Sequence, residues 1–270
     1  MLTFMLNAMT GVILISIASA MIGTYIVTRR MVFISGGITH ACFGGLGLGY
    51  YLGWSPMAMA AVFAVGGALG VDRLSRAGAR RDSAIAVIWA LGMALGILFI
   101  FMTDGYVPEL NTFLFGNVLT ITQTDLWIFG IYDVALLLFY LIFFPLIVTV
   151  SFDPDFARTR HLPAETITFI MTVFTGVAIV LTIRMIGIML LMSLVSLPQL
   201  ISERFTRRYL PLMLLSTCMS LSGCIGGLWL AWMLNVPASA AIVILLVCIY
   251  GIASLLPRRR VPLPPPLHTR

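Results

Sequence analysis

The chain has 270 residues, of which 60% are hydrophobic and 10% are charged, whereas soluble domains contain about 25% charged residues. This composition excludes an ordinary soluble domain, which would need more polar residues to cover its surface. The net charge of +6 comes from arginine alone, because the sequence contains no lysine. The arginines cluster at the ends of apolar blocks, which is typical of cytoplasmic loops in membrane proteins and not of a nucleic-acid-binding face.

The apolar blocks are each about 18–25 residues long, the length that a helix needs to cross the hydrocarbon layer of a bilayer. No alternating pattern of about ten residues recurs, so helices are predicted and a barrel is not. The predicted fold is therefore all-α, a polytopic transmembrane bundle of eight or nine membrane-spanning helices. In chain order the predicted spans are residues 4–28, 33–53, 56–73, 84–103, 126–150, 164–183, 185–203, 209–234 and 237–256.

The distribution of arginine also predicts the orientation. No basic residue precedes the first apolar block, so this block is expected to remain as an anchor with its N-terminus outside the cell. With nine crossings, every arginine cluster then falls on the cytoplasmic side, and only Arg184 lies near the outer face. This agreement supports about nine spans, with eight or ten as the alternatives if some short spans are broken or re-entrant.

The connecting segments differ in character. Residues 104–125 are too polar to span and are expected to form an outer loop with a short helix. The segment "SFDPDFARTRHLP" at 151–163 is a cytoplasmic turn whose alternating charges predict either a docking surface or a merely solvated loop. Two regions are therefore expected, a transmembrane domain over 1–256 and a Pro/Arg-rich cytoplasmic tail over 257–270.

Small residues spaced four apart recur within the predicted spans. Glycine has no β-carbon, so such pairs let two helices approach closely in lipid. We therefore expect these positions to be helix-packing contacts. The pairs are Gly45 with Gly49, Gly66 with Gly70, Gly92 with Gly96, and Gly223 with Gly227.

The chain carries no recognisable catalytic motif, so we expect a non-enzymatic subunit that binds no cofactor. A P-loop requires a lysine, so any ATP-driven work must come from another polypeptide. Ionisable residues within spans are the usual pointers to a transport path, and two stand out. His40, in the second span, is either a metal ligand or a hydrogen-bonded core residue; Asp133, in the fifth, either faces an aqueous cavity or bonds a neighbouring helix. Cys42 is the only cysteine considered as a further ligand, because it lies two residues after His40.

From Arg29 onward the stretch "RRMVFISGGITHACFGGLGLGY" resembles the permease family of zinc and manganese ABC importers. In that family a basic pair precedes Gly-Asp-x-x-x-His and a glycine-rich helix. Here Arg29 and Arg30 match the basic pair, His40 matches the histidine, and Gly45 lies in the glycine-rich continuation. Further similar segments follow in family order: "RRDSAIAVIWALGMALGILFI", "LNTFLFGNVLTIT", "FDPDFARTR", "MIGIMLLMSLVSLP" and "GLWLAWMLNVPASAAIVIL".

The resemblance implies a membrane permease that forms a homodimer, carries two cytoplasmic ATPase subunits and receives metal from a periplasmic or lipid-anchored binding protein. It places the chain in the cell (inner) membrane, with a divalent metal ion, either zinc or manganese or else iron, as cargo. It further implies that His40 lines the metal path, with Asp133 as a second candidate. The ATPase contact would be made by Asp153, Asp155, Arg158 and Arg160.

One departure bears on the metal. The family aspartate, one helical turn before the histidine, falls at Gly36 here, so half of an Asp-His pair on one helix face is missing. Either the metal path uses His40 together with other polar groups, such as Thr39 or Asp133, or the subunit transports a different substrate. A second departure is His161, where relatives have glycine, and we interpret it as a loop residue. The alternative function is an ion-gradient-driven secondary transporter or channel without an ATPase, which usually shows internal repeats that are not evident here.

Overall fold

A computed structural model describes residues 2–103, 116 and 121–255, and no strand occurs among them. Eight of the described helices are long and apolar enough to cross a membrane. The predicted tail, 257–270, and most of the predicted outer loop lie outside the described residues. The helices are α1 (Leu2–Thr28), α2 (Val32–Leu52), α3 (Pro56–Arg76), α4 (Arg81–Phe101), α6 (Gln123–Phe152), α7 (Pro154–Thr159), α8 (Ala164–Ser202), α9 (Tyr209–Leu234) and α10 (Ala238–Leu255).

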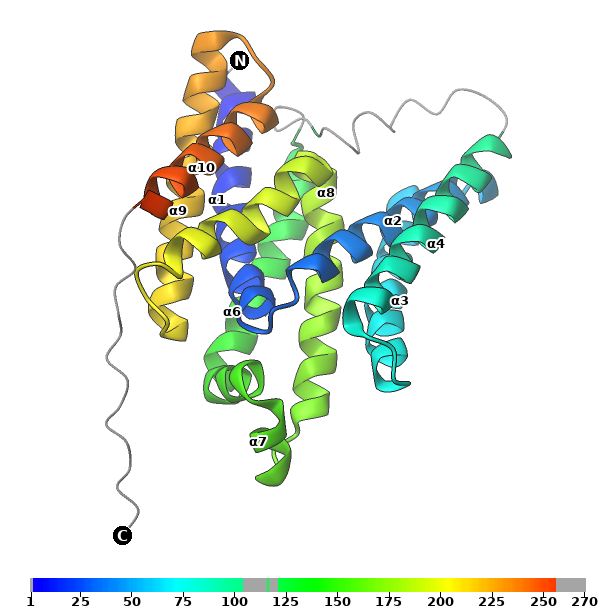
Figure 1. Cartoon of the computed structure of the whole chain (residues 1–270). Coiled ribbons are helices and arrows are strands. Elements are labelled where there is room, and N and C mark those ends of the chain that lie inside the picture. The colour runs from blue at the N-terminus through cyan, green and yellow to red at the C-terminus, as the bar shows by residue number, and fades with distance from the viewer. Residues whose placement is uncertain (1, 104–115, 117–120, 256–270) are drawn as a thin grey trace.

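The all-α prediction is confirmed, and the predicted span limits differ from the helix ends by at most three residues wherever one span matches one helix. The exception is α8, which contains both the sixth and the seventh predicted spans. Its backbone leaves the helical region at Gly187, where φ is 76° and ψ is 173°. In Figure 1 the chain rises before this break and descends after it. Thus α8 consists of two segments that run in different directions, and the predicted boundary lies close to the break.

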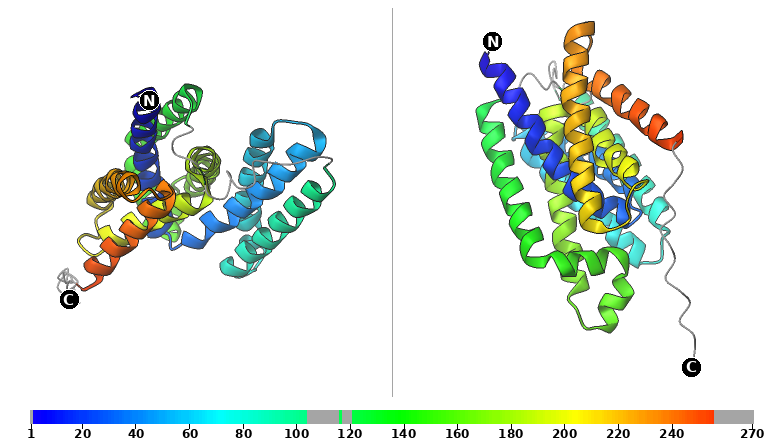
Figure 2. Two further views of the ribbon diagram at one scale, coloured as in Figure 1. Left: turned by 90° about the horizontal axis from the view of Figure 1, so that it is seen from above. Right: turned by 90° about the vertical axis from the view of Figure 1, so that its left-hand side faces the viewer.

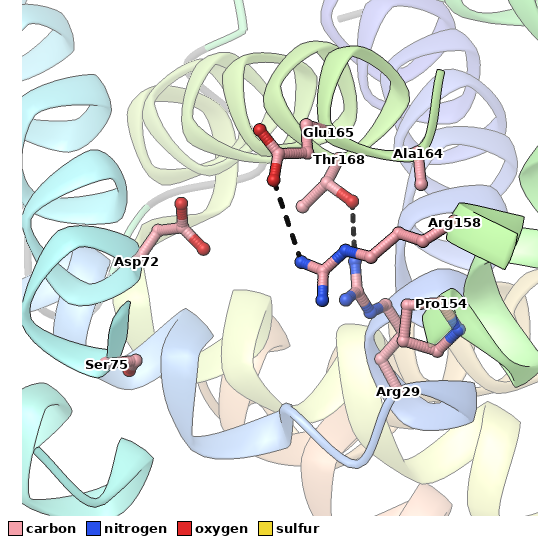
Figure 3. Close-up of a pocket in the computed structure, with 8 residues that line it drawn as sticks. All are labelled: Arg29, Asp72, Ser75, Pro154, Arg158, Ala164, Glu165 and Thr168. Carbon is pink, nitrogen blue, oxygen red and sulfur yellow. Dashed lines mark hydrogen bonds and ion pairs between the residues drawn. The ribbon is translucent and has the colours of Figure 1, made fainter. Parts of the chain in front are cut away.

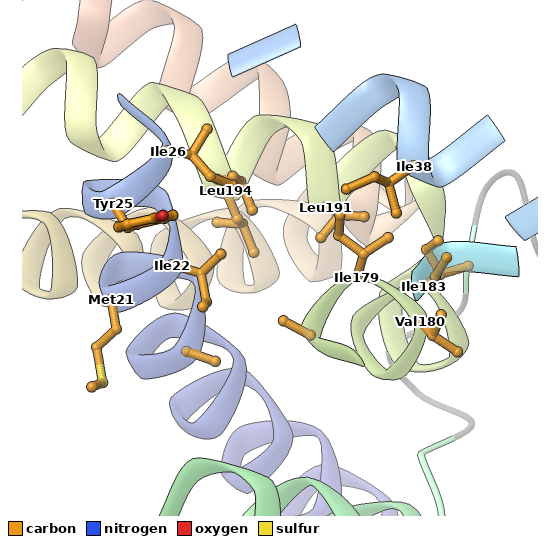
Figure 4. Close-up of a cluster of buried hydrophobic side chains, with 14 of the residues drawn as sticks. Met21, Ile22, Tyr25, Ile26, Ile38, Ile179, Val180, Ile183, Leu191 and Leu194 are labelled. Atoms are coloured by element: carbon orange, nitrogen blue, oxygen red, sulfur yellow. The ribbon is translucent and has the colours of Figure 1, made fainter. Parts of the chain in front are cut away.

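The helices are arranged in two groups around α8. Figure 1 and the left view of Figure 2 place α2, α3 and α4 together on one side, with α9 and α10 on the other. Buried side chains of α1, α2 and both segments of α8 meet between the groups, among them Ile22, Ile38, Ile183 and Leu191 (Figure 4). These residues are at most 1% exposed. The core therefore anchors α2, which carries His40, to the rest of the bundle.

Glycine contacts set the distance between α2 and its neighbours. An added β-carbon on Gly92 of α4 would lie 2.5 Å from the carbonyl oxygen of His40, and one on Gly45 of α2 would lie 2.4 Å from that of Met59 on α3. Close backbone approach of this kind needs glycine. Gly223 and Gly227 of α9 likewise face Leu246 and Ile242 of α10. The packing prediction is confirmed for these pairs.

The prediction is wrong for Gly66, whose added β-carbon would have no neighbour within 4 Å. Gly66 instead lines an open apolar hollow between α2, α3 and α4. Glycine spacing alone therefore does not show which face of a helix meets a neighbour.

The arginine-bearing ends of the helices gather at one end of the molecule. Arg29 at the end of α1 donates to the Thr168 hydroxyl of α8 at 3.1 Å, and Arg204 after α8 donates to the Ser254 carbonyl near the end of α10 at 2.7 Å. Arg184, predicted near the other face, pairs with Asp125 in the first turn of α6 at 2.7 Å. The first two contacts tie the segments after α1 and after α8 to neighbouring helices, and the third ties α8 to α6. The orientation in the membrane stays a prediction.

Candidate functional site

His40 lies in the middle of α2 and is half-buried. Its imidazole stacks on the ring of Trp89 from α4, with centroids 4.3 Å apart and planes 13° apart. Its Nδ1 lies 3.1 Å from the Sδ of Met93, one turn further along α4. The close α2–α4 packing at Gly92 brings both side chains against the histidine. His40 is therefore held by contacts on one neighbouring helix, and it remains partly accessible.

Gly36 lies one turn before His40 on the same face of α2. An added β-carbon here would lie 3.2 Å from the Cε of Met192 on α8 and 3.3 Å from the Cζ3 of Trp89. Both contacts are tighter than normal van der Waals packing. A β-carbon at position 36 would therefore require Met192 and Trp89 to shift by a few tenths of an ångström.

The other polar groups near His40 are engaged with the backbone. The Thr39 hydroxyl is fully buried and donates to the Ser35 carbonyl at 2.6 Å. Ser35 donates from its own hydroxyl to the Val32 carbonyl at 2.7 Å, and its Oγ lies 3.6 Å from the Sδ of Met192. Cys42 is fully buried and lies about 200° around the helix from His40. Neither Thr39 nor Cys42 joins the histidine.

Asp133 lies in α6 and is 7% exposed. Neither of its carboxylate oxygens has a hydrogen-bond partner, so it does not bond a neighbouring helix of the same chain. Helix α6 packs against α1 and α8, whereas α2 packs mainly against α3, α4 and α8. The structure does not bring Asp133 and His40 together, and the described residues contain no group of three His, Cys, Asp or Glu residues suited to a metal.

The predicted docking turn forms the short helix α7, which projects from the arginine-bearing end (Figures 1 and 2). Asp153 caps this helix by accepting from the Phe156 amide at 2.8 Å. Arg158 lies 3.2 Å from Asp155 and 3.8 Å from Glu165 of α8. Arg160 stacks over the ring of Phe156, with its guanidinium 5.5 Å from the ring centroid. The four predicted ATPase-contact residues therefore lie together, and His161 follows them in an exposed turn.

A pocket of about 250 Å³ lies behind α7, where the ends of α1, α3 and α8 converge (Figure 3). It is lined by groups of both signs, with Arg29 and Arg158 on one wall and Asp72 and Glu165 across from them. Because the walls come from four helices, a movement of α7 changes the shape of this pocket. The sequence predicts the turn but not the pocket.

The sequence alone does not predict that Trp89 and Met93 contact His40 or that Met192 lies beside Gly36. Trp89 and Met93 are four apart, as are Gly36 and His40, so each pair shares one helix face. That spacing was readable from the sequence. The sequence does not show which face of α4 or of α8 meets α2, because apolar residues surround both helices.

Comparisons with known proteins agree with this architecture. The model of the ABC 3 transport family matches residues 1–256. A "Probable metal transport system membrane protein" of Chlamydia pneumoniae is 34% identical over 86% of this chain and 81% of its own length. The "Manganese transport system membrane protein MntC" of Halalkalibacterium halodurans is 30% identical over 93% of this chain and 86% of its own.

A solved structure shows the same fold. The structure titled "PsaBC from Streptococcus pneumoniae in complex with Fab" superimposes with a TM-score of 0.83 at 25% identity, covering 95% of this chain and 93% of that one. The family match spans nearly all of the chain, including the helices that carry His40, Asp133 and α7. The chain therefore belongs to the ABC 3 transport family and is the membrane-spanning permease of a metal-type ABC transporter.

Proposed function

We propose that this permease forms a homodimer in the cell (inner) membrane and imports a divalent metal ion with energy from two separate cytoplasmic ATPase subunits. A periplasmic or lipid-anchored binding protein delivers the ion to the outer face. The single observation that carries the cargo is the partly accessible imidazole of His40 inside α2, in a chain of a metal-transporting family. The chain itself supplies the path and no catalytic group.

Zinc is the first candidate and manganese the second, with iron as a further one. Imidazole suits zinc, whereas manganese prefers oxygen ligands. The Sδ of Met93 lies 3.1 Å from Nδ1 of His40. The carboxylate expected at position 36 is replaced by Gly36, beside which the Cε of Met192 lies. Asp133 is proposed as a separate polar point on the path, because a carboxylate without a partner in an apolar helix is costly to keep.

The cytoplasmic partner is proposed to bind at α7 through Asp153, Asp155, Arg158 and Arg160. These residues lie in α7 or at its two caps, and α7 projects from the molecule (Figure 1). Movement of α7 would reach α8 directly, since Arg158 pairs with Glu165 in the first turn of that helix. Hydrolysis could thereby alternate the access of the path to the two faces.

The test is uptake into liposomes that contain this permease with its ATPase and binding protein. Zinc, manganese and iron(II) are offered separately, with and without ATP in the lumen. We expect one of the three metals to enter, and only when ATP is present. If the complex hydrolyses ATP and none of these metals enters, the metal proposal is overturned. Uptake driven by an ion gradient without the ATPase would instead support a secondary transporter, which the family match does not favour.

A further inference from the structure

Helix α6, which leads into α7, is not one continuous rod. Its backbone leaves the helical region at Phe143, where φ is −109° and ψ is 16°, and Pro145 follows two residues later. Proline has no amide hydrogen to donate to the preceding turn, and its ring crowds the carbonyl there, so a break is expected at this place. Asp153 ends α6 and also caps α7, so the two helices share a residue. A displacement of α7 would therefore move the segment 144–152 relative to the rest of α6.

The side chain of Tyr209, the first residue of α9, lies against α6 on both sides of this break. Before the break, the ring of Tyr140 stacks with that of Tyr209 at a centroid distance of 6.5 Å, and the two hydroxyl oxygens are 3.0 Å apart. After the break, the rings of Phe144 and Phe152 meet Tyr209 edge-on, at centroid distances of 5.9 and 6.3 Å. Tyr140 and Tyr209 are both buried. One buried side chain of α9 therefore touches both segments of α6.

The hydrogen bonds around Tyr209 have a definite direction. Tyr140 donates its only hydroxyl proton to the Met21 carbonyl of α1 at 2.9 Å, so Tyr209 is the donor in its hydrogen bond with Tyr140. The buried Ser151 hydroxyl also interacts with the Tyr209 phenol, and it donates its own proton to the Ile147 carbonyl at 2.6 Å. Tyr209 thus has one proton to donate and two acceptors beside it, Tyr140 before the break and Ser151 after it.

We infer that Tyr209 is a positioning residue that transmits a displacement of α7 to α1 and α9, by exchanging its hydrogen bond between Tyr140 and Ser151 as the break in α6 bends. This inference rests on the proposed function, because α7 is the proposed ATPase contact. A bond to Tyr140 ties α9 to α1 through the Met21 carbonyl. A bond to Ser151 ties α9 to the segment that carries α7. Coupling between distant sites requires an element with two discrete arrangements of this kind.

The first test follows amide hydrogen exchange in the full-length permease bound to its ATPase, with and without a non-hydrolysable ATP analogue. In the wild type, the analogue is expected to change exchange in 144–159 and also in the first turn of α9 and around Met21 of α1. Tyr209→Phe keeps the ring but removes the hydroxyl, so the change is expected to remain confined to 144–159. Tyr250→Phe is the matched control, because Tyr250 lies on α10, which packs against α8 and α9, and it should behave as wild type.

The second test measures metal ions taken up per ATP hydrolysed in proteoliposomes. Tyr209→Phe should lower this ratio by about fivefold, the factor that corresponds to one typical hydrogen bond, while the ATPase still binds and hydrolyses ATP. Ser151→Ala, which leaves Tyr209 in place, should lower the ratio in the same direction. Adding Ser151→Ala to Tyr209→Phe should cause no further loss, because both substitutions remove the same bond.

Three results would overturn the inference: exchange changes in the wild type that do not reach α9 and α1, changes that reach them equally in Tyr209→Phe, or losses from Tyr209→Phe and Ser151→Ala that simply add. The outcomes also separate the inference from the proposed function. If the exchange change reaches α9 only when Tyr209 is present but no metal enters the liposomes, the positioning role stands and the import function falls. If uptake is ATP-dependent and its ratio to hydrolysis is the same in Tyr209→Phe and Tyr250→Phe, import stands and the positioning role falls.

Discussion

The His40 region and the α7 region were both expected to carry function, and they are built in different ways. At His40, backbone contacts at glycine bring α4 against α2, so the function depends on side chains fixed by packing. At α7, the charged groups project into solvent, and the side chains of Asp155 and Arg158 are 85% and 57% exposed. Exposed pairs contribute little to stability. Substitutions in the His40 region should therefore affect folding and metal transport, whereas substitutions in the α7 region should affect binding of the partner.

The largest expected effect is that of Gly92→Ala. The new β-carbon would lie 2.5 Å from the backbone oxygen of His40, which cannot rotate away. We expect a loss of stability of about 1–3 kcal/mol, as for other overpacked cores, seen as a lower melting temperature in detergent. Gly66→Ala is the control, because its β-carbon would meet nothing, and it should keep or raise the melting temperature. Equal behaviour of the two variants would contradict the role of the α2–α4 contact.

His40→Ala should remove transport and leave assembly intact. The imidazole contacts only Trp89 and Met93 among the described partners, so its loss opens space at a partly exposed position. We expect ATP-dependent metal uptake to fall by more than about tenfold, while the permease still co-purifies with its ATPase. Unchanged uptake would refute a ligand role.

Arg158→Glu should weaken binding of the ATPase and leave the fold of the permease intact. Reversing this charge removes the pairs with Asp155 and Glu165 and is expected to slow association with the ATPase in a salt-dependent manner. The melting temperature of the isolated permease in detergent should hardly change, because exposed ion pairs contribute little to stability. Arg207→Glu, an equal charge change at another exposed arginine, serves as the control in a pull-down of the ATPase. If both variants lose the ATPase equally, α7 has no special role.

The smallest expected effect is that of Asp133→Asn. Both carboxylate oxygens lack partners, so a neutral amide of the same shape should leave the melting temperature equal or higher, because a buried charge is costly. We expect uptake to fall less than in His40→Ala. Unchanged uptake would remove Asp133 from the proposed path.

The fold was largely predictable because its signals are local. Apolar block lengths predict the helix limits. The orientation that arginine placement indicates stays a prediction. The chain reversal within α8 was placed between 183 and 185, close to the break at Gly187. These features depend on the membrane as a solvent, which acts on each segment separately.

The candidate site was only partly predictable. His40 and Gly36 were identified from their spacing and the family resemblance, but Trp89, Met93 and Met192 come from two other helices. Their approach depends on which faces pack, and helices that are apolar on all sides do not encode this in their periodicity. The Arg184–Asp125 pair was missed for the same reason, because its members lie on different helices.

The break at Gly187 also means that the residues around His40 and Gly36 come from two parts of the bundle. His40, Trp89 and Met93 belong to the glycine-packed pair of α2 and α4, whereas Met192 belongs to the descending segment of α8, five residues beyond the break. The ascending segment of the same helix starts beside α7. A tilt of the descending segment of α8 relative to α2 would therefore move Met192 against Gly36 and Ser35, whereas the stacked rings of His40 and Trp89 would move together with the α2–α4 pair.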